Sequence, residues 1–160
     1  MVKVAIGQDS HRFVEPGDTK ELVLGGVVIP GERGLAGNSD ADVILHAITN
    51  AVSGITTVNI LGAKADELCL GKGIMDSSVY LKKGLEYLEG YKLTHISLSI
   101  EALKPKLAAH TLSIRENISR LLDIPLDSVA MTATTGEGLT DFGKGLGMQC
   151  FVILTAQKIV

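Results

Sequence analysis

The stretch LTHISLSIEAL, from Leu93 to Leu103, alternates apolar and polar residues through Ile96, Leu98 and Ile100. Alternation with a period of two predicts a half-buried β-strand. The chain continues with a helical pattern at 106–122, a strand pattern at 129–133, a glycine-rich segment at 136–147 and a last strand at 148–157. This order of strand, helix, strand, loop and strand predicts an α+β fold.

The first half adds two strand regions and two helices. Val2, Val4 and Ile6 predict a strand that ends near Asp9, and residues 21–29 predict a strand, a bend at Gly25-Gly26 and a second strand. We expect a helix at about 40–53 that Ser39 caps, a long loop at 54–73 with one turn of helix, and a helix at about 76–89. The expected architecture is one domain over residues 1–160, with a single sheet and helices packed on one of its faces.

Composition excludes several classes of protein. The 160 residues carry a formal charge of −3 and show no stripe of Lys or Arg, which argues against a nucleic-acid partner. Apolar runs stop well short of the roughly 20 residues that span a bilayer, and the strand pattern at Val2 leaves no room for a signal peptide. Cys69 and Cys150 are far apart, so we expect no disulfide framework and a cytoplasmic location.

Two short segments contain metal-ligating residue types. Asp9 and His11 are two positions apart on a predicted strand, so their side chains point the same way and suit a zinc ion. His46 lies in an otherwise apolar helix that must pack on this strand, which makes it a candidate third ligand. The alternative interpretations are a solvated strand end and a histidine held by a backbone carbonyl.

Other segments suit a phosphorylated ligand. Gly37-Asn38-Ser39 precedes a helix, where free N–H groups attract anions, although Asn and Ser there more often only cap the helix. The segment 133–137, Ala-Thr-Thr-Gly-Glu, offers hydroxyls and a carboxylate for a diphosphate with Mg²⁺, or forms a simple β-turn. Lys104-Pro105-Lys106 with His110 could add phosphate contacts or could be a solvated helix start. Together these segments predict a metal and a phosphorylated ligand but do not name a reaction.

Taken in order, the segments resemble the 2-C-methyl-D-erythritol 2,4-cyclodiphosphate synthase family. Residues 6–13, IGQDSHRF, are similar to the family's G-x-D-x-H-x-F, and residues 38–47, NSDADVILHA, are similar to H-S-D-G-D-V-x-x-H-A. Residues 24–30 match the next strand pair, and residues 102–110 resemble the A-x-x-P-K segment. Residues 133–139 and 143–147 resemble A-T-T-x-E-x-L and G-R-x-E-G. The resemblance covers nearly the whole chain.

The resemblance implies a homotrimer with active sites between subunits. Zn²⁺ would bind Asp9, His11 and His46, and Glu137 would hold Mg²⁺ or Mn²⁺ on the diphosphate of a cytidine-diphosphate substrate. The reaction would be that of a phosphorus–oxygen lyase, which closes 4-diphosphocytidyl-2-C-methyl-D-erythritol 2-phosphate into 2-C-methyl-D-erythritol 2,4-cyclodiphosphate and releases CMP. Asn38 and Thr135 would be catalytic. The implied substrate-binding residues are Asp9, His11, Asn38, Ser39, Ile60, Leu61, Gly62, Ala102, Lys106, Leu107, Ala108, Ala133, Thr134, Thr135, Glu137, Asp141 and Lys144.

Several positions depart from the family pattern. Asn38 replaces a usual His, Asn50 a usual Asp, and Lys144 an Arg, which loses bidentate phosphate binding. The segment 55–75 departs most, with Asn59-Ile60-Leu61-Gly62 in place of D-I-G, and this loop would grip the erythritol hydroxyls. Two alternatives therefore stay open: a zinc protein of the same fold that acts on another nucleotide diphosphate, and a non-catalytic module that binds a phosphorylated ligand.

Overall fold

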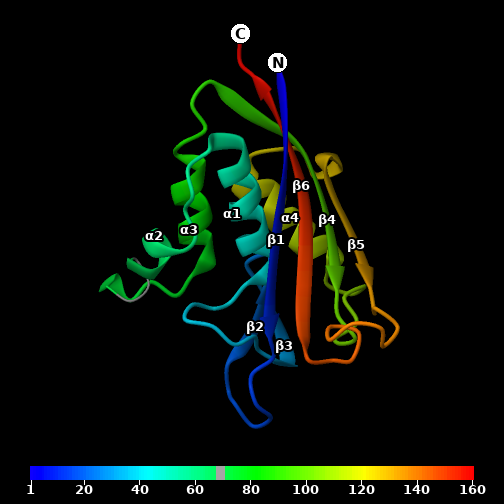
Figure 1. Cartoon of the computed structure of the whole chain (residues 1–160). Helices are drawn as coiled ribbons and strands as arrows, with labels where there is room; N and C mark the ends of the chain where they lie inside the picture. The colour runs from blue at the N-terminus through cyan, green and yellow to red at the C-terminus, as the bar shows by residue number, and fades with distance from the viewer. Residues whose placement is uncertain (68–70) are drawn as a thin grey trace.

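A computed structural model of the chain describes residues 1–67 and 71–160. Four strands form the main sheet: β1 (Val2–Arg12), β4 (Tyr91–Glu101), β5 (Val129–Thr134) and β6 (Gly147–Lys158). Two further strands are β2 (Glu21–Leu24) and β3 (Val27–Arg33). The helices are α1 (Val43–Thr56), α2 (Ala63–Asp66), α3 (Ser77–Leu85) and α4 (Thr111–Leu122), followed by the 3₁₀ turn η2 (Leu126–Ser128) (Figure 1).

The main sheet has the strand order β1-β6-β4-β5. Strand β6 pairs antiparallel with both β1 and β4, whereas β4 and β5 are parallel. The parallel pair is joined through α4, because parallel neighbours need a crossover connection. The predicted α+β class is confirmed, and the structure shows that the main sheet is mixed.

The prediction of a single sheet is wrong, because β2 and β3 form a separate two-stranded sheet. Gly25 and Gly26 make the tight turn between them with φ of 60° and 79°, a left-handed conformation that glycine adopts without steric cost. Their N–H groups both donate to the carboxylate of Asp42, which ties the hairpin to the start of α1.

Helices cover one face of the main sheet and leave the other open (Figure 1). Helix α1 packs on β1 so closely that a Cβ atom built on Gly7 would lie 1.9 Å from the carbonyl oxygen of Ala47. The odd-numbered residues of β1 face this helix, and its even-numbered residues face outward. Val4 and Ile6, which predicted the strand by their hydrophobicity, are therefore on the exposed face.

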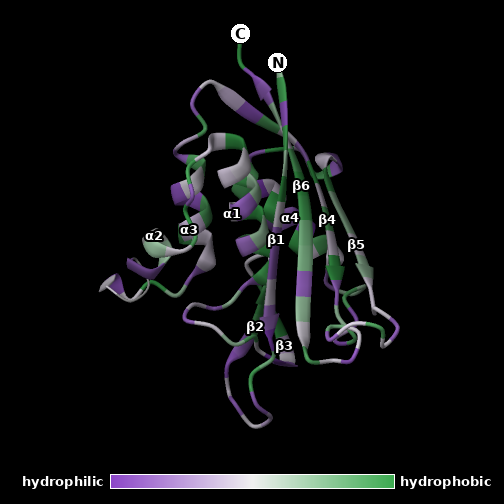
Figure 2. Ribbon diagram, viewed as in Figure 1, coloured by the Kyte–Doolittle hydropathy of each residue, from purple (hydrophilic) through white to green (hydrophobic). Residues whose placement is uncertain are grey.

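The core is built from aliphatic residues of the helices and the inner face of the sheet. The six residues predicted to form the apolar side of α1 are fully buried: Val43, Leu45, Ala47, Ile48, Ala51 and Val52. Strand β6 buries the alternate set Met148, Cys150, Val152, Leu154 and Ala156. Figure 2 shows apolar residues concentrated on β6 and on the helix faces turned toward it.

The predicted boundaries of β1 and α1 need correction. Strand β1 continues past Asp9 to Arg12 because β6 pairs with it over that whole length. Helix α1 begins at Val43, since the carboxylate of Asp42, and not the hydroxyl of Ser39, caps it by accepting the N–H groups of Ile44 and Leu45. The helix ends at Thr56, so it takes up the first residues of the predicted long loop.

The other two helices are shorter than predicted. Helix α3 covers Ser77–Leu85 and is capped by Asp76. Helix α4 begins at Thr111, because Leu107 and His110 close a separate turn after the cis Lys104–Pro105 bond. The predicted loop at 54–73 includes residues 68–70, which lie outside the described residues; in its described part, α2 is the expected turn of helix.

Two predictions from composition concern the cysteines and membrane spans. Cys150 is a buried free thiol, and Cys69 lies outside the described residues. Within residues 1–67 and 71–160, no helix combines the length and the apolar character that crossing a membrane requires.

Candidate functional site

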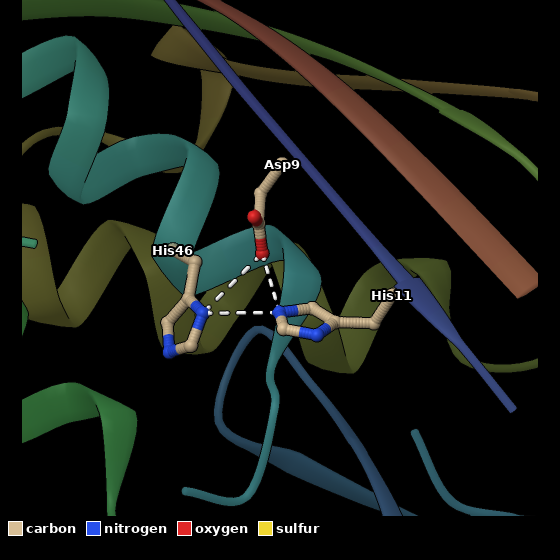
Figure 3. A group of neighbouring side chains, drawn as sticks. All are labelled: Asp9, His11 and His46. Atoms are coloured by element: carbon tan, nitrogen blue, oxygen red, sulfur yellow. Dashed lines mark hydrogen bonds and ion pairs between the residues drawn. The ribbon is translucent and has the colours of Figure 1, made fainter. Parts of the chain in front are cut away.

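Asp9, His11 and His46 converge on one point (Figure 3). Oδ2 of Asp9 lies 2.7 Å from Nε2 of His11 and 3.3 Å from Nδ1 of His46. The two imidazole nitrogens are 3.3 Å apart. Three metal-ligating atoms thus form a small triangle, as the sequence predicted.

The fold brings these residues together through one close contact between a strand and a helix. Asp9 and His11 both lie on the odd-numbered, inward face of β1. His46 lies in the first turns of α1, one residue before Ala47, whose carbonyl approaches Gly7. Because no side chain separates the two backbones at Gly7, the imidazole of His46 reaches the strand.

The outer ring nitrogens have their own partners. Nδ1 of His11 lies 2.9 Å from the carbonyl oxygen of Ala36, which can only accept, so Nδ1 carries a proton. In the neutral imidazole the lone pair is then on Nε2, the atom that faces the triangle. Nε2 of His46 lies 2.8 Å from Oγ of Ser77 and 3.4 Å from Oγ of Ser39. Nδ1 of His46 therefore faces the triangle.

The electrostatics of the triangle favour a bound cation. Burial alone would lower the pKa of His11, but the close contact with the Asp9 carboxylate and the charge of that carboxylate raise it. Burial likewise raises the pKa of Asp9, and the two histidines lower it on balance. Oδ2 of Asp9 is buried and lacks a hydrogen bond of regular geometry among the described residues. An orphaned carboxylate oxygen beside two imidazole nitrogens fits a metal ion such as zinc.

A pocket of about 260 Å³ opens on this triangle. Four other predicted site residues line it: Asn38, Ser39, Leu61 and Gly62. Ile60, also predicted, is instead buried with Tyr80 in a small separate cluster. The expectation of free helix N–H groups beside Asn38 is wrong for Ile44 and Leu45, because the carboxylate of Asp42 accepts both.

Most remaining predicted residues line a second pocket, of about 200 Å³: Ala102, Lys106, Leu107, Ala108, Ala133, Thr134 and Thr135. The structure does not join this pocket to the metal triangle within one chain. Asp141 lines a third pocket together with His11, and Lys144 lines another with Arg33 and Lys104.

Glu137 is exposed in a turn, with φ of 50° between Gly136 and Gly138. The hydroxyl oxygens of Thr134 and Thr135 accept the N–H groups of Gly136 and Glu137 at 3.3 Å, so the segment forms a turn. Glu137 is not part of the triangle formed by Asp9 and its neighbours.

Several residues near the triangle were not predicted as site residues. Asp66 and Tyr80 line the pocket, and Asn50 lines it while its amide donates to the carbonyl of Gln8 at 3.0 Å. Ser77 contacts His46 from the start of α3. A signal for Ser77 exists in the sequence, since it directly follows the helix cap Asp76, but the pairing with His46 depends on how α3 packs.

Comparison with known proteins is in accord with this geometry. The YgbB family model matches residues 2–157. The 2-C-methyl-D-erythritol 2,4-cyclodiphosphate synthase of Chlamydia muridarum (strain MoPn / Nigg) is 49% identical over 98% of this chain and 88% of its own length.

Two solved structures share the fold. The bifunctional IspDF of Campylobacter jejuni superposes with a TM-score of 0.89 at 27% identity, over 99% of this chain and 43% of that longer one. A CDP-bound form of 2C-methyl-D-erythritol-2,4-cyclodiphosphate synthase gives a TM-score of 0.80 at 28% identity, over 97% of this chain and 100% of that one. The chain belongs to the YgbB family, together with relatives that are 2-C-methyl-D-erythritol 2,4-cyclodiphosphate synthases.

Proposed function

We propose that this chain, as one domain over residues 1–160, converts 4-diphosphocytidyl-2-C-methyl-D-erythritol 2-phosphate to 2-C-methyl-D-erythritol 2,4-cyclodiphosphate and CMP. The observation that carries the proposal is the triangle of Asp9, His11 and His46 at a pocket also lined by Asn38 and Ser39. The relatives' names support this product, and the CDP-bound relative supports a cytidine nucleotide.

Zinc is the proposed metal at Asp9, His11 and His46. One carboxylate and two neutral imidazoles are a common catalytic zinc set, with a fourth position left for substrate. Bound there, zinc would supply a Lewis acid that polarises a phosphate oxygen of the substrate. Ala36 fixes the ring of His11 for this role through the hydrogen bond at Nδ1.

The pocket residues would orient the phosphorylated end of the substrate. The amide of Asn38 and the hydroxyl of Ser39 would donate hydrogen bonds to phosphate oxygens. The hydrogen bond from Asn38 would stabilise the negative charge that develops on those oxygens. Leu61 and Gly62 also line the pocket and would contact the methylerythritol. Ile60 would act only by holding Leu61 in place, since its own side chain is buried.

The second pocket would take the cytidine end. Ala102, Leu107 and Ala108 would frame the base, while Lys106 and the hydroxyls of Thr134 and Thr135 would contact the phosphates. Glu137 would hold Mg²⁺ or Mn²⁺, which would supply charge neutralisation on the diphosphate. Ala133, Asp141 and Lys144 complete the proposed binding set.

The proposed reaction needs no nucleophile from the protein, because the 2-phosphate of the substrate supplies one. An oxygen of the 2-phosphate forms a new bond to the β-phosphorus, and the bond from that phosphorus to the CMP oxygen breaks. The electron pair leaves with CMP, so the enzyme is a phosphorus–oxygen lyase. Phosphoryl transfer of this kind needs mainly positioning and charge neutralisation.

A homotrimer would complete the site, and two observations support it. The metal triangle and the second pocket lie apart within one chain. The open face of the main sheet carries Val4, Ile6, Phe151 and Ile153, which are between 43% and 65% exposed, and Ile6 lies opposite Ile153 across β1 and β6. An apolar sheet face of this kind fits contact with other copies.

The buried free thiol of Cys150 suits a reducing cytoplasm, where we place the protein.

The decisive experiment is incubation of the protein with the cytidine-diphosphate substrate and Mg²⁺, followed by ³¹P NMR. The expected result is CMP together with a cyclic diphosphate, and no product with the His46→Ala variant. CDP binding without turnover of this substrate would favour the alternative, a zinc protein of the same fold that acts on another nucleotide diphosphate. The substituted positions Asn50 and Asn59 favour that alternative.

A further inference from the structure

The outer nitrogen of His46 faces a hydrogen-bonded pair that joins two separate elements. Oγ of Ser77, the first residue of α3, lies 2.8 Å from Nε2 of His46. The same hydroxyl donates to Oδ1 of Asp40, in the loop before α1. Ser77 is fully buried, and the side chain of His46 is only 12% exposed.

The direction of these hydrogen bonds follows from counting protons. The carboxylate of Asp40 can only accept, and it also accepts the N–H groups of Ser77 and Asp42 at 3.1 and 3.0 Å. The single proton of the Ser77 hydroxyl therefore points at Asp40. The lone pair left on Ser77 Oγ can only accept, so Nε2 of His46 must carry a proton and donate it.

We infer that Asp40 and Ser77 are positioning residues that fix the tautomer and ring orientation of His46. With the proton held at Nε2, the lone pair of the neutral imidazole is at Nδ1, the atom that faces Asp9 and His11. His11 is oriented in the complementary sense by the carbonyl of Ala36. Partners of this kind hold metal-bound histidines in place and tune their affinity for the ion.

The arrangement also ties the metal ligand to a particular part of the fold. Asp40 donates its N–H to the carbonyl of Met75 at 2.8 Å, so the segment before α3 is fastened to the loop before α1 at two points. Ser77 therefore reaches His46 only when the start of α3 is docked. The orientation of the metal ligand depends on that docking.

The first test reads the tautomer in the metal-free protein, at a pH where the imidazole is neutral. Long-range ¹H–¹⁵N spectra distinguish the two ring nitrogens, and with 4 histidines in the chain the signals of His46 are assigned by their loss in His46→Gln. The expected result is an Nε2–H tautomer in the wild type and a mixture that includes the Nδ1–H form in Ser77→Ala. Ser77→Thr keeps the hydroxyl and should restore the wild-type pattern.

The second test measures Zn²⁺ affinity by competition with a chelator. Ser77→Ala and Asp40→Asn should each bind Zn²⁺ about 10–100-fold more weakly than the wild type, the range for losing such a partner. Ser78→Ala is the matched control, because it makes the same change one residue further along α3 and should leave both readouts unchanged.

Two results would overturn the inference: an Nδ1–H tautomer in the wild type, or an unchanged tautomer and Zn²⁺ affinity in Ser77→Ala. Asp40→Asn decides the matter by the same readouts if Ser77→Ala does not fold. The inference rests on the proposed metal site, but the two can fail separately. A wild type that binds no Zn²⁺ would contradict the proposed metal, whereas the tautomer of the metal-free protein still decides the role of Ser77.

Discussion

His46 is one of the three side chains that meet at the proposed zinc site, and its removal should empty that site. His46→Ala leaves only Asp9 and His11, so zinc content should fall from near-stoichiometric to a small fraction. His95→Ala serves as the control, because His95 is an exposed histidine on β4. Elemental analysis of both variants gives the answer, and full zinc occupancy in His46→Ala would show that the ion binds elsewhere.

Glu137 should act through a second metal and not through zinc. Glu137→Gln should keep its zinc and its CDP affinity but turn over more slowly, because a neutral amide holds Mg²⁺ more weakly. Raising Mg²⁺ or Mn²⁺ should restore part of the rate. Measured side by side with the wild type, loss of zinc in the variant, or unchanged turnover at limiting Mg²⁺, would assign Glu137 a different role.

The sequence predicted the metal ligands better than the residues around them. Asp9 and His11 follow from strand periodicity, which puts positions two apart on one face. His46 could be predicted as a ligand because it lies in an apolar helix that must pack on the strand of Asp9 and His11. Ser77 and Asp66 were not, because their contacts with the site depend on how α2 and α3 pack, and no local pattern encodes that.

The packing of α1 on β1 should depend on the missing side chain of Gly7. A Cβ atom there would meet Ala47 O at 1.9 Å and Ala51 N at 2.6 Å, both backbone atoms that cannot rotate away. Gly7→Ala should therefore push α1 outward, lower the free energy of unfolding by about 1–3 kcal/mol or more, and weaken zinc binding by moving His46. Gly71→Ala is the control, since no neighbouring atom in the described part of the chain lies within 4 Å of a Cβ there.

Chemical denaturation and chelator competition would measure both effects of the Gly7 variant. A fully stable Gly7→Ala protein with normal zinc affinity would mean that the helix does not need this close approach.

Asp42 connects the β2–β3 hairpin to α1, and its titration should make stability depend on pH. Burial raises the pKa of this carboxyl to about 6, although the Leu45 and Gly26 N–H groups oppose the shift. Between about pH 4 and about pH 6, the Asp42 carboxyl is therefore protonated in the folded protein but ionised in the unfolded chain. The contribution of this group to stability should be largest at and below the lower end and should fall as pH rises through 6.

The matched variant is Asp42→Asn, which cannot titrate. Its amide nitrogen would face the N–H group of Gly26, so we expect it to be less stable by roughly 1–3 kcal/mol at neutral pH. The stability gap between wild type and variant should widen as pH falls from 6 to 4, by at most about 1.4 kcal/mol per pH unit. A gap that stays constant over this range in urea titrations would rule out the raised pKa.

Helix starts were the least predictable boundaries. The sequence predicted Ser39 as the cap of the first long helix, but Asp42 caps it, and the Asp42 carboxylate also accepts the N–H groups of the hairpin turn at Gly25 and Gly26. That hairpin contact is long-range and has no local signal. The same applies to α4, which starts at Thr111 after an independent turn that the apolar pattern from Leu107 had hidden.

In the molecule as a whole, the sequence predicted that β1 alternates between two faces but did not predict which of these faces the helices cover. Val4 and Ile6 predicted a strand correctly, yet they lie on the open face, and the inward positions carry Ala5, Gly7 and the metal ligands. A period of two fixes which residues share a face and does not say which face the helices cover. The separate β2–β3 sheet was missed for a related reason, because pairing within a hairpin does not specify whether the hairpin joins a larger sheet.

The exposed apolar face of the main sheet should be the contact surface of the proposed trimer. Ile153 is 52% exposed in the middle of β6 and lies opposite Ile6, which is 65% exposed on β1. Ile153→Lys would place a charge in this contact and remove burial worth about 1.5–3 kcal/mol for each isoleucine covered. Light scattering should therefore show a trimer for the wild type and smaller species for the variant.

Val28→Lys is the control, because Val28 is 47% exposed but lies on β3, outside the main sheet. Turnover should fall with assembly in Ile153→Lys, since the metal triangle and the cytidine pocket would come from different chains. A stable wild-type monomer that still releases CMP would contradict the trimer and require both parts of the site to meet within one chain.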